Sequence, residues 1–145
     1  MGKDGSQRKQ GGTVIFEDAS VNTGAVCWPG EDWAQVTVRR MQTKLHCWAA
    51  GDPCRRFDDL YNLVCDPAFL VVAWQRVAGN AGSRTPGVDR ATVAWIASRV
   101  GVEEFLQDVR DRLRARTFQP VEVRQVEIPK ASGKLRKLGI PTVAA

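Results

Sequence analysis

The sequence predicts an α+β fold in which a helical N-terminal region is followed by a single β-hairpin. Three observations support this prediction. Several segments between residues 31 and 117 have apolar residues with a period close to 3.6. Residues 121–128 alternate apolar and polar side chains, which is the period of a half-buried strand. A glycine-containing turn at 131–134 and a second short extended segment at 135–140 then complete a hairpin.

Residues 1–30 form the first predicted unit, a disordered tail. This segment is rich in Gly, Ser, Asn, Asp and Thr, and its apolar patches, such as residues 14–16, are short. It buries too little apolar area to offset the entropy lost on ordering. The turn-forming sequence Trp-Pro-Gly at residues 28–30 ends the tail.

Residues 31–117 form the second unit, a helical extension. Its first helix begins at Glu31 and Asp32, because acidic side chains are favoured at the positive end of the helix dipole, and it ends at the Gly-Asp-Pro of residues 51–53. Asp66 precedes a proline that suits a first helical turn, and Asp89 is the expected N-cap of the fourth helix. The later helices are expected at 55–65, 67–77, 91–98 and 102–117.

Residues 118–145 form the third unit, the hairpin, and with the preceding helix end they hold most of the positive charge. From residue 110 onward there are nine Lys or Arg against three acids, a net charge of +6. The other 109 residues hold 12 basic and 13 acidic side chains, so they sum to −1 and the chain's +5 is local. This layout is typical of a phosphate-binding surface, although a solvated basic face explains it equally well.

Lys130 and Arg136 flank the hairpin turn on opposing strands. A turn centred on residues 132–133 would place both side chains on one side of the ribbon, where they suit a triphosphate or a nucleic-acid backbone. The alternative is that they protect an exposed strand edge from aggregation. The glycine-rich loop at 79–89, with Arg84, offers backbone amides to phosphate, but it matches neither common phosphate-binding glycine motif and also suits a plain connector.

Residues for catalysis or metal binding are few. The single histidine, His46, lies on a predicted helix, and the four cysteines form no CxxC pair, so we expect no metal site and no catalytic residue.

No run of about 18 apolar residues exists, which predicts no membrane span. No secretory signal opens the chain, so we expect a cytoplasmic protein with reduced thiols.

The sequence resembles the N-terminal part of group II intron reverse transcriptases, also called maturases, over roughly residues 36–143. Two motifs support the resemblance: TPGVD at 85–89, and IPKASGKLRKLGIPT at 128–142. The resemblance implies an RNA-directed DNA polymerase of a mobile genetic element. In that family the helices form an N-terminal extension, the TPGVD loop covers the template strand and the hairpin belongs to the fingers sheet, which would be incomplete here.

The resemblance also implies roles for individual residues. Lys130 and Arg136 correspond to the cations that contact the triphosphate of the incoming dNTP. The loop at 80–89 corresponds to the template-side loop. The expected nucleic-acid-binding residues are Asn80, Arg84, Thr85, Gly87, Arg110, Arg112, Arg114, Arg116, Lys134 and Lys137.

The sequence departs from the family at Lys137, where proline is usual, and at Arg90, where glycine often follows TPGVD. In the family, the palm aspartates that hold two Mg²⁺ ions follow the hairpin. These 145 residues do not include them, so we expect no cofactor and no polymerisation by this fragment alone. The expected partners are RNA, as intron or template, a dNTP, and a separate chain that supplies the palm. Two alternatives remain open: a stand-alone basic RNA-binding module, or a decayed remnant of the polymerase.

Overall fold

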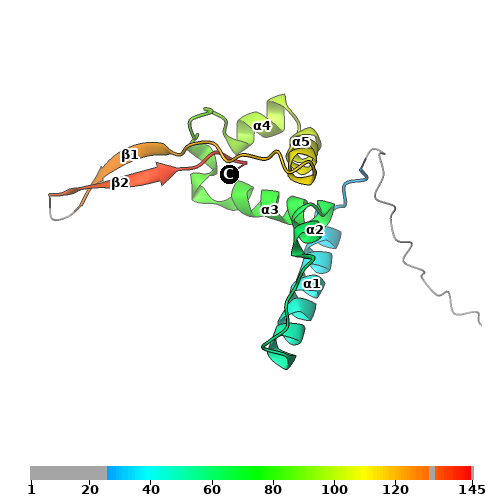
Figure 1. Ribbon diagram of the computed structural model, residues 1–145. Helices are drawn as coiled ribbons and strands as arrows, with labels where there is room; N and C mark the ends of the chain where they lie inside the picture. The colour runs from blue at the N-terminus through cyan, green and yellow to red at the C-terminus, as the bar shows by residue number, and fades with distance from the viewer. Residues whose placement is uncertain (1–25, 131–132, 145) are drawn as a thin grey trace, which may run out of the picture.

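The computed structural model describes residues 26–130 and 133–144, and it confirms the predicted α+β class. Helices come first along the chain, and a two-stranded antiparallel sheet follows them (Figure 1). Most of the tail predicted to be disordered, residues 1–25, lies outside the described residues, as do residues 131–132 of the turn. The elements are α1 (Glu31–Gly51), α2 (Leu60–Val64), α3 (Pro67–Gly79), the 3₁₀ helix η1 (Ala81–Arg84), α4 (Val93–Arg99), α5 (Val102–Arg114), β1 (Arg124–Pro129) and β2 (Leu135–Ile140).

The core lies where α1 packs against α3. Small or β-branched residues meet there: Ala34 is fully buried, and Val38 and Ala68 are nearly so. Because these side chains are short, the two helices approach closely. The larger Trp33 stays 60% exposed on another face of α1. The rest of α1 runs away from the body of the molecule, as Figure 1 shows.

Helix α3 begins as the sequence predicts. The Asp66 carboxylate accepts hydrogen bonds from the backbone N–H groups of Ala68 and Phe69, at 2.8 and 3.3 Å, and Pro67 occupies the first turn. These bonds satisfy two of the free N–H groups that every helix start exposes. The helix continues to Gly79, two residues beyond the predicted end.

The helix predicted at 55–65 is wrong in its first half, because only Leu60–Val64 is helical. The Arg55 guanidinium instead lies 4.8 Å from the ring centre of Trp48 and 5.6 Å from that of Phe57. These contacts fold the segment after α1 back onto the end of that helix. The cation–π contacts of Arg55 and the stacking of Phe57 on Trp48 therefore replace the helix that the apolar spacing of this stretch predicts.

The later helices also differ from prediction at their ends. Thr92, rather than Asp89, caps α4 by accepting a hydrogen bond from the N–H of Trp95, while Asp89 accepts one from Ala91. Helix α5 ends at Arg114 and not at residue 117, because Arg116 adopts φ 55° and the chain reverses. The N–H of Arg116 donates to Leu113 and that of Thr117 donates to Arg112, which is the Schellman pattern of helix ends.

The two strands form a ribbon that projects beyond the helices (Figure 1). Its register pairs Arg124 with Ile140 at one end and Pro129 with Leu135 at the other. Beyond that last pair, the Lys130 N–H donates to the Lys134 carbonyl at 2.7 Å. Gly133, at φ 77°, adopts the left-handed backbone conformation that glycine reaches without strain.

Candidate functional site

The register decides which side chains share a face of the ribbon. Residues directly opposite each other point to the same side, and so do residues two apart on one strand. Arg136 pairs with Ile128, so it lies on the same face as Lys130, and Lys134 joins them opposite Lys130. We call this side the Lys130 face. It comprises Arg124, Val126, Ile128, Lys130, Lys134, Arg136, Leu138 and Ile140.

Three cations therefore converge at the tip of the Lys130 face. Lys130 and Lys134 are directly opposite, and Arg136 is the diagonal neighbour of Lys130, at a spacing that long side chains bridge. All three are exposed. Like charges this close repel one another, and an anion bound between them relieves the repulsion. The arrangement is suited to a phosphate group.

Lys137 does not belong to this cluster. The register pairs it with Glu127 on the opposite face of the ribbon, where the two charges have opposite signs. A ligand held by Lys130 and Arg136 therefore lies on the other side of the sheet from Lys137. Of the cations predicted near the turn, the structure brings three together and separates the fourth.

The glycine-rich loop packs against the chain that leaves β2. Gly87 is buried, and a Cβ placed on it would lie 2.9 Å from the Pro141 carbonyl oxygen. A cavity of about 390 Å³ lies beside this contact, and Asn80 and Thr85 line it from the loop while Leu138 and Ile140 line it from the ribbon. The two motifs that the sequence singled out are therefore in contact, and the cavity lies at the base of the Lys130 face.

The loop residues proposed for nucleic-acid binding differ in access. Arg84 is exposed in the last turn of η1, and Asn80 and Thr85 are exposed at the cavity wall. Gly87 is buried under the segment after β2, so its own backbone is covered by protein in this structure.

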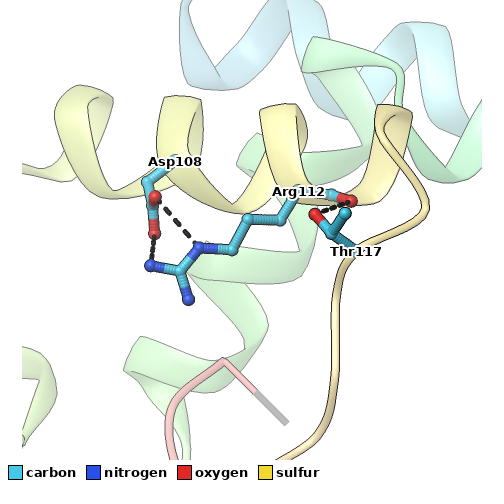
Figure 2. A network of polar contacts seen from close by, with 3 residues as sticks. All are labelled: Asp108, Arg112 and Thr117. Atoms are coloured by element: carbon cyan, nitrogen blue, oxygen red, sulfur yellow. Dashed lines mark hydrogen bonds and ion pairs between the residues drawn. The ribbon is translucent and has the colours of Figure 1, made fainter.

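The arginines of α5 have different neighbours. The Arg110 Nε–H donates to the Cys65 carbonyl at 2.9 Å and the side chain is half-buried, although the sequence analysis expected Arg110 to bind nucleic acid. Arg112 forms a two-bond ion pair with Asp108, with Nε 3.0 Å from one carboxylate oxygen and a terminal nitrogen 2.8 Å from the other (Figure 2). Arg116 lies over the ring of Tyr61, 5.3 Å from its centre, and Arg114 is exposed.

Arg124 is a further candidate for phosphate binding, and the sequence analysis did not predict this role. Its Nε is buried and has no hydrogen-bond partner among the described residues, although buried polar nitrogens are normally paired. It lies on the Lys130 face beside Ile140, which lines the cavity. The sequence contains a signal for this placement. Arg124 and Lys130 are an even number of residues apart in an alternating strand, so their side chains lie on the same face.

Within the described ranges, no group of three or more His, Cys, Asp or Glu side chains could hold a metal ion. Among the residues that the structure describes, the carboxylates therefore do not form the cluster that the Mg²⁺ ions of the resembled family require. No helix among the described residues is long and apolar enough to cross a membrane.

Comparison with known proteins adds two relatives. The protein YkfC of Escherichia coli K12 is 42% identical over 108 residues, which cover 74% of this chain and 28% of YkfC. The group II intron-encoded protein LtrA of Lactococcus lactis subsp. cremoris is 33% identical over 87 residues, 59% of this chain and 14% of LtrA. This chain is distantly related to group II intron-encoded proteins. It spans less than a third of the length of either relative, and no protein-family model matches it.

Proposed function

We propose that this chain is the N-terminal part of a group II intron-type reverse transcriptase and maturase, and that it holds RNA template and the phosphates of an incoming dNTP. The proposal rests on the three cations at the tip of the Lys130 face, which are Lys130, Lys134 and Arg136. Arginine offers a fork of donors that matches phosphate oxygens, and each lysine adds a point charge. The distant link to LtrA supports the same assignment.

Each of the three units has its own role. Residues 1–30 are a tail, residues 31–117 hold template RNA through the loop at 79–89 and the end of α5, and residues 118–145 hold the nucleotide. The aspartates that bind Mg²⁺ in the intact family member belong to a palm outside these residues, in the same polypeptide or in a separate chain. We place the protein in the cytoplasm, and we expect no polymerisation from these 145 residues alone.

Nucleotide binding by matched variants tests the proposal. Arg136→Gln and Lys137→Gln remove the same charge from adjacent positions on opposite faces of the ribbon. Binding of dGTP, measured by isothermal titration calorimetry, should weaken roughly 10- to 150-fold with Arg136→Gln, since a charge-assisted hydrogen bond contributes about 1.5–3 kcal/mol. It should change little with Lys137→Gln. Equal effects of the two variants would contradict a site on the Lys130 face.

RNA binding needs its own measurement. Fluorescence anisotropy of a labelled single-stranded RNA should show affinity that falls steeply with salt, because each neutralised phosphate adds about 0.7 to the slope of log K against log salt. No affinity at about 50 mM salt would remove the template-binding half of the proposal. RNA affinity without dGTP binding would instead favour a stand-alone RNA-binding module.

A further inference from the structure

The buried contact between Gly87 and the chain after β2 leaves no room for any side chain. A Cβ on Gly87 would lie 2.9 Å from the Pro141 carbonyl oxygen and 3.0 Å from the Thr142 N and Cα atoms. All three are backbone atoms, so no change of side-chain rotamer relieves the overlap. By contrast, a Cβ on Gly82, five residues earlier in the same loop, would meet nothing within 4 Å.

This contact lies where the ribbon joins the helical body. The strands β1 and β2 pack chiefly against each other, so the ribbon's direction depends on the segments that enter and leave it. Thr142, in the segment that leaves, is 6% exposed, and Val143 and Ala144 line an apolar cavity between α3 and α5. The exit segment is therefore anchored to the helices directly after the strand ends.

The other side of the contact is also anchored. The 3₁₀ helix η1 packs on α3 and α4, and the Asp89 carboxylate accepts a hydrogen bond from the Ala91 N–H at 3.1 Å. Gly87 thus belongs to a loop held at both ends by helices. The exposed Arg84 is on the same loop, and the Lys130 face continues into the cavity that the loop and β2 share.

We propose that Gly87 is a positioning residue, whose missing side chain lets the exit of β2 rest on the loop and so fixes the direction of the ribbon. The Lys130 face then has a fixed relationship to Arg84. The structural claim does not depend on the function proposed above. Its consequence does: if RNA lies on the loop and dNTP on the ribbon, the fixed direction sets the distance between the two ligands, so that a base of the RNA can pair with the dNTP and each ligand raises the affinity for the other.

Residual dipolar couplings of the ¹⁵N-labelled chain test the structural claim, because they report the orientation of N–H bonds in the ribbon and in the helices. In the unmodified chain and in Gly82→Ala, couplings of β1, β2, α3 and α5 should fit one alignment tensor. In Gly87→Ala the couplings of the ribbon should fall relative to those of α3. A common tensor that survives Gly87→Ala would overturn the proposal.

A second measurement keeps the proposal testable if Gly87→Ala does not fold. Nuclear Overhauser effects in the unmodified chain should join the Gly87 Hα protons to the Thr142 amide proton, because the two backbones touch at this point. Absence of these effects, or ribbon couplings that do not fit the alignment tensor of α3 and α5, would overturn the proposal.

Binding measurements test the consequence separately. Saturating single-stranded RNA should raise the affinity of the unmodified chain and of Gly82→Ala for dGTP, and this gain should be lost in Gly87→Ala. If the unmodified chain binds neither probe, the proposed function fails, while the dipolar couplings still decide the role of Gly87. If both probes bind and Gly87→Ala keeps the full gain, the coupling role of Gly87 is wrong.

Discussion

Lys130 and Lys134 lie directly opposite each other at the tip of the ribbon, where the Lys130 backbone N–H donates to the Lys134 carbonyl oxygen with an N···O distance of 2.7 Å. Their side chains share a face, and both are exposed. Like charges directly opposite on a sheet are destabilising, by up to about 1 kcal/mol. The ribbon therefore gives up some stability and concentrates positive charge at its tip.

Replacing one of these lysines with an acid should reverse the balance. Lys134→Glu converts the repulsion with Lys130 into attraction, so the ribbon should gain roughly 0.2–1 kcal/mol, and its amide hydrogens should exchange up to about fivefold more slowly. Binding of dGTP should weaken at the same time. Hydrogen exchange followed by NMR, together with calorimetry, measures the two effects.

Lys137→Glu is the matched control, since it places a second acid opposite Glu127 on the other face. It should speed amide exchange in the ribbon, which is the opposite sign, and affect dGTP binding much less. If Lys134→Glu and Lys137→Glu change exchange in the same direction, the register-based account of the tip is wrong.

Asp108 holds the Arg112 guanidinium through two bonds on the surface of α5 (Figure 2). The two side chains are 53% and 59% exposed, so the pair adds little stability. Asp108→Asn should cost less than about 0.5 kcal/mol in thermal unfolding. It should also free Arg112 for RNA, so that the slope of log K against log salt becomes steeper by up to about 0.7.

Asp111→Asn is the control for that experiment. It removes an equal charge from the same helix, but the Asp111 carboxylate accepts a hydrogen bond from Gln107 and not from an arginine. The steeper salt dependence should therefore be specific to Asp108→Asn. An equal change in both variants would mean that RNA responds to net charge alone.

Much of the fold could be predicted from local signals. The starts of α1 and α3 and the whole of β2 follow from acidic residues, an Asp-Pro cap and a glycine turn, which act within a few residues. The first half of the helix predicted at 55–65 is wrong, because that prediction rested on the spacing of apolar residues alone. In the structure Arg55 lies over the ring of Trp48 instead, and a spacing pattern does not encode such a tertiary contact. The choice of Thr92 over Asp89 as a cap could not be predicted, since both residues suit that role.

Local sequence patterns also indicate some features of the candidate site but not others. The shared face of Lys130 and Arg136 follows from strand alternation once the turn is placed, so the sequence could indicate it. The contact of Gly87 with Thr142 and the hydrogen bond of Arg110 to Cys65 join residues far apart in the sequence. No local pattern encodes such contacts, because they depend on how the elements pack.

The N-cap of α3 gives a test of stability that is independent of any ligand. Asp66→Ala removes the acceptor of the Ala68 and Phe69 N–H groups, and losing such a cap costs about 1 kcal/mol. Because α3 contributes Ala68 and Val72 to the core, the loss should appear in the free energy of unfolding measured by urea titration. Asp58→Ala, at an exposed site before α2, should change it by less than about 0.5 kcal/mol.

Arg110 and Arg114 lie one turn apart on α5, and the structure predicts different effects of removing them. Arg110 is half-buried and donates to the carbonyl of Cys65, which is itself buried, so Arg110→Ala leaves that acceptor without its donor. We expect a loss of about 1–3 kcal/mol in unfolding free energy. Arg114 is exposed, and Arg114→Ala should change stability by less than about 0.5 kcal/mol while it lowers the RNA salt slope by about 0.7. Urea titration and anisotropy on the same two variants separate these roles, because a purely RNA-binding Arg110 would leave the unfolding midpoint where it is in the unmodified chain.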